Sequence, residues 1–124
     1  MSVYNQQKIL IVEDNFMSYK LMEVHFTRAN LDLLHASDGF SALDIFKSNP
    51  DIALVLMDIQ LPGMSGLDVT KRIREINSDV PVIATTGNVF DDDKTACMEA
   101  GCTHYFTKPI NFPEIFKVLD KYFS

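Results

Sequence analysis

The stretch Ile52-Ala53-Leu54-Val55-Leu56-Met57, followed at once by Asp58, decides how this chain folds. A run so short and so apolar is typical of a strand that is buried on both faces, and such strands belong to parallel sheets. A carboxylate that follows the run is expected at the carboxyl edge of the sheet, where open parallel sheets bind their ligands. The sequence therefore places Asp58 at the predicted functional edge.

Three further strand-like runs also end in residues that suit chemistry. The residues that follow these runs are Glu13-Asp14, Thr85-Thr86-Gly87 and Lys108-Pro109. The carboxyl ends of parallel strands share one edge, so we expect acids, a hydroxyl and an ammonium around one crevice. This combination predicts a site for a divalent cation and a phosphoryl group.

Strand-like and helix-like segments alternate five times along the chain, which is typical of a parallel sheet with helices on both faces. The predicted strands are Lys8–Glu13, Asp32–Ala36, Ile52–Met57, Pro81–Thr85 and Thr103–Thr107. The predicted helices are Phe16–Ala29, Phe40–Ser48, Gly66–Ile76, Val89–Ala100 and Phe112–Phe123. The helix that begins at Val89 has an inner stripe of small residues, and we expect it to shift easily.

Length and composition restrict the protein class. The 124 residues suit one domain, 1–124, and the residues after Pro109 suffice for one helix, so no output domain is expected. No apolar run approaches the roughly 20 residues that span a bilayer, and the polar N-terminus favours a cytoplasmic location. The net charge is −6, from 17 acids and 11 bases, which disfavours direct binding to nucleic acid.

The acids and the lysine at the predicted carboxyl edge of the sheet have complementary chemical roles. Crowded acids at Glu13, Asp14 and Asp58 raise one another's pKa, and a hard cation such as Mg²⁺ relieves the repulsion. Lys108 can neutralise a phosphoryl group, and Asp58 can attack it to form an acyl phosphate. Each residue alone also fits a turn or a helix cap, but their placement at successive strand ends favours the functional interpretation.

Four segments together resemble the receiver domains of two-component response regulators, in order and spacing over nearly the whole chain. They are Ile9-Leu10-Ile11-Val12-Glu13-Asp14-Asn15, Met57-Asp58-Ile59-Gln60-Leu61-Pro62-Gly63-Met64-Ser65-Gly66, Ile83-Ala84-Thr85-Thr86-Gly87 and Tyr105-Phe106-Thr107-Lys108-Pro109-Ile110. The resemblance implies a flavodoxin-like, doubly wound α/β fold with five parallel strands in the order 2-1-3-4-5 and five helices on two faces.

The resemblance also implies individual roles. Asp58 would be the phosphoacceptor, and Mg²⁺ or Mn²⁺ would bind Glu13, Asp14, Asp58 and the backbone carbonyl of Gln60. The phosphoryl group would contact Thr86, Gly87, Lys108 and the backbone N–H of Ile59. Thr86 and Tyr105 would form the switch, and the Lys108–Pro109 peptide bond would be cis. Gly87 departs from the family pattern, in which this position is commonly alanine.

The expected function is that of a phosphoacceptor signalling module in a two-component or phosphorelay system. Its partners would be a histidine kinase or a histidine phosphotransfer protein and a downstream protein, with no turnover beyond self-phosphorylation and autodephosphorylation. Two alternatives are a receiver domain excised from a hybrid histidine kinase and a pseudo-receiver that binds partners without phosphorylation. Small-molecule enzymes fit less well. Gln60 replaces the second acid of the D-x-D motif in haloacid dehalogenases, and Glu13 and Asp14 would repel a flavin phosphate.

Overall fold

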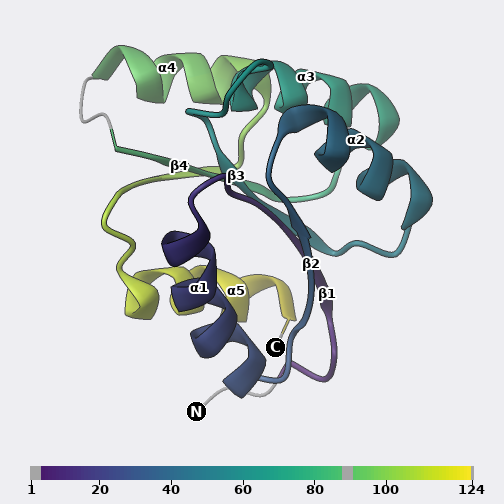
Figure 1. Ribbon diagram of the computed structural model, residues 1–124, viewed down its shortest axis with the longest axis vertical. Coiled ribbons are helices and arrows are strands. Elements are labelled where there is room, and N and C mark those ends of the chain that lie inside the picture. The colour runs from purple at the N-terminus through teal and green to yellow at the C-terminus, as the bar shows by residue number, and fades with distance from the viewer. Residues whose placement is uncertain (1–3, 88–90, 124) are drawn as a thin grey trace.

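The apolar runs form one parallel sheet, and the computed structural model describes residues 4–87 and 91–123 (Figure 1). The strands are β1 (Lys8–Val12), β2 (Asp32–Ala36), β3 (Leu54–Asp58), β4 (Val82–Thr86) and β5 (His104–Thr107). They are ordered β2-β1-β3-β4-β5, and every pair is parallel. The sheet order and the doubly wound fold implied by the resemblance are therefore confirmed.

Five helices cover the two faces of this sheet. They are α1 (Phe16–Arg28), α2 (Gly39–Ser48), α3 (Gly66–Ile76), α4 (Asp91–Ala100) and α5 (Phe112–Phe123). Helices α1 and α5 lie on one face, and α2, α3 and α4 lie on the other (Figure 1). Residues 89 and 90, with which we expected the fourth helix to begin, lie outside the described residues.

The alternation of side chains along each strand explains the two cores. On β1, Ile9 and Ile11 are buried against α1 and α5, whereas Leu10 and Val12 are buried with side chains of α2 and α3. Successive residues of a strand point to opposite faces, so a continuous apolar run supplies both cores. All five residues of β3 are buried, as the run that ends at Asp58 predicts.

The bounds of β1, β3, β4 and β5 differ from the expected ones by one or two residues, and the largest difference is at the start of β3. Strand β3 begins at Leu54 rather than Ile52, because the Ile52 N–H donates to the Asn49 carbonyl at 3.1 Å in a turn. A strand assignment from apolarity alone does not register this competing hydrogen bond. At its carboxyl end β3 extends one residue beyond the predicted Met57 and includes Asp58.

Helix caps set the functional edge of the sheet. Asn15 and Asp38 are the N-caps of α1 and α2, and their side chains accept from the N–H groups of Ser18 and Ser41 at 2.9 and 2.8 Å. Such caps satisfy N–H groups that an α-helix leaves unpaired. They start each helix a few residues after its strand, which keeps the edge compact. Within residues 4–87 and 91–123, no helix combines the length and the apolarity needed to cross a bilayer.

Candidate functional site

Asp58 and Lys108, fifty positions apart in sequence, meet at the carboxyl edge of the sheet. Asp58 is the last residue of β3, and only 2% of its surface is exposed. Lys108 directly follows β5, and its Nζ donates to Asp58 Oδ2 at 3.1 Å. The Lys108–Pro109 peptide bond is cis. A nearly buried carboxylate thus has one oxygen paired with an ammonium.

Glu13 completes the buried ionic cluster from the end of β1. It is 1% exposed, and its Oε1 lies 3.1 Å from Lys108 Nζ. This is an ion pair rather than an aligned hydrogen bond, since no donor among the described residues points correctly at that oxygen. The other oxygen, Oε2, accepts from the Asn15 N–H at 3.1 Å. Glu13 therefore has a buried oxygen with capacity for another positive partner.

Three acids are placed to hold a cation. Glu13, Asp14 and Asp58 each offer one oxygen, and these oxygens lie within 4.8 Å of one another. Glu13 and Asp58 are buried, whereas Asp14 is exposed. Magnesium prefers oxygen ligands and commonly keeps several waters, so two buried acids and one open side fit it. The incompletely satisfied oxygen of Glu13 agrees with such a ligand set.

The cluster changes the acidity of its members. The pKa of Asp58 is raised from 3.8 to about 6. Burial is the main cause and the charge of Glu13 adds to it, while the Gln60 N–H and Lys108 act in the opposite direction. Burial acts to lower the pKa of Lys108, but its contacts with Glu13 and Asp58 outweigh burial and raise that pKa. The ammonium thus stays charged, while the carboxylate cluster retains electrostatic strain that a cation would relieve.

The backbone amides of the loop after Asp58 have different hydrogen-bond partners. The Ile59 N–H donates to the Thr85 carbonyl at 3.1 Å, so the pairing of β3 with β4 uses it and it does not point into the site. The Gln60 N–H donates instead to Asp58 Oδ1 at 2.9 Å. The assignment of the Ile59 N–H to the phosphoryl group therefore stays a prediction, and in this arrangement that N–H serves the sheet. The amide of this loop that faces Asp58 belongs to Gln60.

Glycine at position 66 allows this loop to fold back closely. A Cβ at Gly66 would lie 2.3 Å from the Asp58 carbonyl oxygen and 2.6 Å from Ile59 Cα. The Gly66 N–H donates to the Ile59 carbonyl at 3.1 Å, which closes the loop. A side chain at this position would push α3 away from the end of β3. The backbone of Gln60 is consequently fixed beside Asp58.

The residues predicted to form the switch lie on the neighbouring strands β4 and β5. Thr86 is the last residue of β4 and is buried, and its carbonyl accepts from the Lys108 N–H at 2.7 Å. Gly87 follows at the surface, and its N–H donates to the Gln60 side-chain oxygen Oε1 at 3.1 Å. Tyr105 on β5 is half-buried and packs against the core beneath α2, α3 and α4. The structure thus brings Thr86, Gly87 and Lys108 together at the same edge.

His35 contributes a contact that sequence reasoning did not find. Its Nε2 lies 2.9 Å from the Glu13 carbonyl oxygen, and its ring stacks on Tyr19 with centroids 3.7 Å apart. The Glu13 N–H also donates to the Ala36 carbonyl at 3.0 Å. Periodicity gives no signal that the His35 ring reaches the residue after β1. The ring lies between Glu13 and Tyr19 and so helps to fix the acidic loop that joins β1 to α1.

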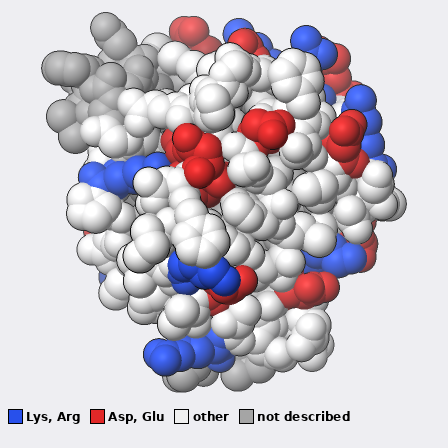
Figure 2. Space-filling view, in the orientation of Figure 1, with Lys and Arg blue, Asp and Glu red and all other residues white. Residues whose placement is uncertain are grey.

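Charge is mixed over the surface around these elements. On the face seen in Figure 2, acidic and basic side chains of the described residues are interspersed, with no continuous basic stripe there. The molecule as a whole carries a net charge of −6. The positive charge that matters for the site is therefore the local ammonium of Lys108.

Comparisons with known proteins agree with this geometry. The family described as "Response regulator receiver domain" matches residues 9–120. DivK, a polar-differentiation response regulator of Brucella anthropi, is 34% identical over 119 residues, which cover 94% of this chain and 95% of DivK. Hybrid signal transduction histidine kinase I of Dictyostelium discoideum is 38% identical over 122 residues. That match covers 92% of this chain but 7% of the kinase.

Two solved structures share the fold. The receiver domain of Saccharomyces cerevisiae Ssk1, crystallised with the histidine phosphotransfer protein Ypd1, matches with a TM-score of 0.89 and 27% identity, covering 98% of this chain and 92% of that one. The receiver domain of the Pseudomonas aeruginosa sensor histidine kinase PA1611, with magnesium coordinated in its active-site cleft, gives 0.86 and 29%, covering 94% and 97%.

A doubly wound sheet with acids and a lysine at its carboxyl edge is the architecture of a phosphoacceptor domain. The chain belongs to the response regulator receiver domain family, and it is a receiver domain of two-component or phosphorelay signalling.

Proposed function

We propose that the chain accepts a phosphoryl group on Asp58 from a phosphohistidine of a histidine kinase or a histidine phosphotransfer protein. The observation that carries this proposal is the buried pairing of Asp58 Oδ2 with Lys108 Nζ at 3.1 Å. A nucleophilic carboxylate and a charge-neutralising ammonium are the two groups that this transfer needs most. The complex of Ypd1 with the Ssk1 receiver domain shows that a relative engages a phosphotransfer protein.

A divalent cation belongs to the proposal. Glu13, Asp14 and Asp58 would hold Mg²⁺ or Mn²⁺ together with the backbone carbonyl of Gln60, and the ion would neutralise charge on the phosphoryl oxygens. The proximity of three carboxylate oxygens, all within 4.8 Å, supports this ligand set. Magnesium in the cleft of the PA1611 receiver domain supports the choice of ion.

The residues of this chain divide the reaction between them. A carboxylate oxygen of Asp58 forms a bond to phosphorus, the phosphorus–nitrogen bond of the donor breaks, and the imidazole leaves with the bonding electrons. Lys108 stabilises the negative charge on the transferred group, and the Thr86 hydroxyl and the Gly87 N–H bind its other oxygens. Strand β3 and the loop that follows it keep Asp58 oriented throughout the reaction.

The proposed response spreads from Thr86 on β4 to the neighbouring edge strand, β5. Thr86 would move toward the phosphoryl group, and the ring of Tyr105 would turn into the space that this movement leaves. The surface formed by α4, β5 and α5 would change as a result and would bind a downstream protein. The small buried side chains in the described part of α4, Cys97 and Ala100, support a helix that shifts at low cost.

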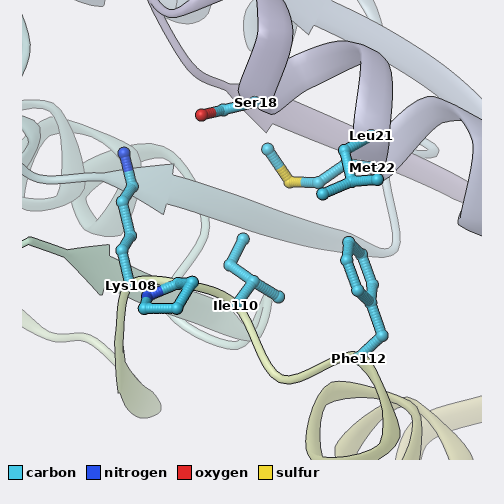
Figure 3. Close-up of a pocket in the computed structure, with 7 residues that line it drawn as sticks. Ser18, Leu21, Met22, Lys108, Ile110 and Phe112 are labelled. Atoms are coloured by element: carbon cyan, nitrogen blue, oxygen red, sulfur yellow. The ribbon is translucent and has the colours of Figure 1, made fainter.

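The donor is proposed to dock beside α1. Several large apolar side chains are exposed there, namely Phe16, Met17, Leu21 and Val24, at 65%, 73%, 55% and 44%. Next to them, α1 and the segment after β5 form a pocket of about 110 Å³ (Figure 3). The stem of Lys108 lines this pocket, and its amino group extends away from Ile110 and Phe112. An apolar partner surface seated here would deliver its phosphohistidine to Asp58.

The proposal also covers whether the receiver domain acts by itself or as a segment of a hybrid kinase. We propose that residues 1–124 act as a single receiver domain in the cytoplasm. The match to 95% of the length of DivK supports one receiver domain over this stretch. The 38% identity with a hybrid kinase favours the alternative, a receiver segment within such a kinase. Both alternatives require the same chemistry at Asp58.

Intact-protein mass spectrometry tests the phosphoacceptor function. The protein is incubated with acetyl phosphate, with magnesium or with a chelator, and we expect one added phosphoryl group only with magnesium. Asp58→Asn should abolish the adduct, whereas Asp68→Asn, at an exposed position on α3, should retain it. A pseudo-receiver would gain no adduct, and an adduct that persists in Asp58→Asn would refute the assignment of the acceptor.

A further inference from the structure

The side chain of Gln60 bridges two loops at the mouth of the site. Its Oε1 accepts from the Gly87 N–H at 3.1 Å, across 27 positions of sequence. Gln60 lies two residues after Asp58, and Gly87 directly follows Thr86 at the end of β4. Both residues are exposed, so solvent can reach this bond. The bridge thus spans the opening through which a phosphoryl group would reach Asp58.

Both ends of this bridge are anchored. The Gln60 N–H is held by Asp58 Oδ1 at 2.9 Å, and the preceding residue pairs with β4 through the 3.1 Å bond to Thr85. On the other side, the Thr86 carbonyl is held by the Lys108 N–H at 2.7 Å. Each end of the bond therefore extends from a fixed backbone. Only the side-chain torsions of Gln60 need to change for the bond to open.

The bond occupies a donor that the proposed reaction requires. The Gly87 N–H is the amide assigned above to a phosphoryl oxygen, and a well-aligned N–H serves one acceptor at a time. The amide oxygen of Gln60 is a neutral acceptor, whereas a phosphoryl oxygen is charged and accepts more strongly. Arrival of the phosphoryl group would therefore displace the Gln60 side chain into water.

We propose that Gln60 is a latch that holds the Gly87 N–H in the unphosphorylated protein and competes with the incoming phosphoryl group. This inference rests on the proposed function, because it concerns the same site. The latch stabilises the resting arrangement of the two loops and lowers the affinity for the anion. Since an exposed amide hydrogen bond contributes modestly, removing it should tighten anion binding by about two- to tenfold.

Two measurements on Gln60→Met test the latch. Methionine keeps the length of the side chain but removes the amide oxygen that accepts from Gly87. In nitrogen-15 NMR spectra with magnesium and no anion, the Gly87 amide proton should move upfield, as expected when a hydrogen bond is lost. In a titration with beryllofluoride, a phosphoryl mimic, the variant should bind about two- to tenfold more tightly than the wild type.

Gln6→Met is the matched control. The side chain of Gln6 also makes an exposed hydrogen bond, from Nε2 to Asn30 Oδ1 at 2.7 Å, but it precedes β1 at the opposite edge of the sheet. This control should change neither the Gly87 resonance nor the beryllofluoride affinity. An effect equal to that of Gln60→Met would show that any lost glutamine bond acts in this way, and it would overturn the latch.

The outcomes separate the latch from the function on which it rests. If the wild type binds beryllofluoride and Gln60→Met binds it equally or more weakly, the latch is overturned while the phosphoacceptor function stands. An unmoved Gly87 resonance in Gln60→Met also overturns the latch. If the wild type itself takes up no beryllofluoride with magnesium, the phosphoacceptor function fails, and the latch fails with it.

Discussion

The two helices on either side of β5 differ sharply in how they are packed. Helix α5 buries four apolar side chains against β1, β3 and β4, namely Phe112, Ile115, Val118 and Leu119. Helix α4, in the part whose side chains are described (94–100), buries Cys97 and Ala100. Large buried side chains resist displacement, whereas small ones leave an element that opens at low free energy.

This difference divides the site by task. Glu13 follows β1, Asp58 ends β3, and Lys108 lies in the segment that leads to α5. These elements pack on the well-filled α5 side, so the chemical groups keep their geometry. Thr86 and Gly87 lead toward α4, so a movement at that end of the site meets little resistance. One small domain can therefore hold a rigid reaction centre beside a responsive element.

The largest expected effect contrasts the two helices directly. Ile115 and Cys97 are both fully buried, one on α5 and one on α4. Ile115→Ala should lower the free energy of unfolding by about 2–5 kcal/mol, because it leaves a cavity in a filled core. Cys97→Ala removes a single sulfur and should cost about 1 kcal/mol. Urea unfolding measures both, and equal costs would contradict the claim that α4 is weakly packed.

The second prediction concerns the buried charge of Asp58 in the rigid reaction centre. The pKa of Asp58 is about 6 in the folded protein and 3.8 ordinarily, so between these values the folded state binds a proton that the unfolded state does not. The stability contributed by this group is therefore greatest below pH 4 and is lost as the pH rises through 6. In chelator at pH 7, Asp58→Asn should raise the free energy of unfolding by about 1–3 kcal/mol.

The pH dependence supplies the control for this prediction. The advantage of Asp58→Asn over the wild type should shrink as the pH falls from 7 to 4, because the native carboxyl then becomes neutral as well. Chemical unfolding at several pH values measures this convergence. A variant less stable than the wild type at pH 7 would indicate that the bond to Lys108 outweighs the repulsion from Glu13, and the strain assigned to the cluster would be wrong.

Magnesium should specifically stabilise the part of the molecule around Glu13, Asp14 and Asp58. At a concentration ten times its dissociation constant, the ion should add about 1.4 kcal/mol to the free energy of unfolding by mass action. Thermal unfolding with magnesium or chelator measures the total, and Asp14→Asn should reduce it. Hydrogen exchange sharpens the comparison, because added protection should appear in residues 8–15 and 54–60 before α4. Protection concentrated in α4 would contradict the proposed division.

The sequence predicts the parts of the site that strand ends determine. Apolar runs that stop at Glu13, Asp58 and Thr86 identify the carboxyl edge, because burial forces these strands into the centre of the sheet. The bounds of α3 and α5 agree with their periodicity, Gly66–Ile76 and Phe112–Phe123. Hydrophobic patterns work well here because each predicted element buries its own stripe.

Cross-strand details are not encoded in such patterns. Apolarity does not show which backbone amides the sheet uses, and the Ile59 amide donates to the Thr85 carbonyl. The His35 ring at the Glu13 carbonyl and the Gln60 side chain at Gly87 likewise join residues 22 and 27 positions apart. These contacts depend on register and rotamers, which only the folded backbone determines.

The smallest expected effect is that of a substitution at Gly87, directly after β4, where the responsive part of the site begins. Gly87 does not have the positive φ angle that favours glycine. Among the described residues, leaving out its chain neighbours, a Cβ there would meet Gln60 Oε1 at 3.4 Å, an ordinary contact. Gly87→Ala should therefore raise the free energy of unfolding by about 0.4–1 kcal/mol, by restricting the unfolded chain. Gly101→Ala is the contrasting control, because Gly101 has φ +107° and a Cβ would lie 2.8 Å from Arg74 Cγ. Urea unfolding should show a gain for the first variant and a loss for the second. A loss for Gly87→Ala would mean that the loop after β4 needs glycine in its resting state, and that the responsive half is more constrained than its packing indicates.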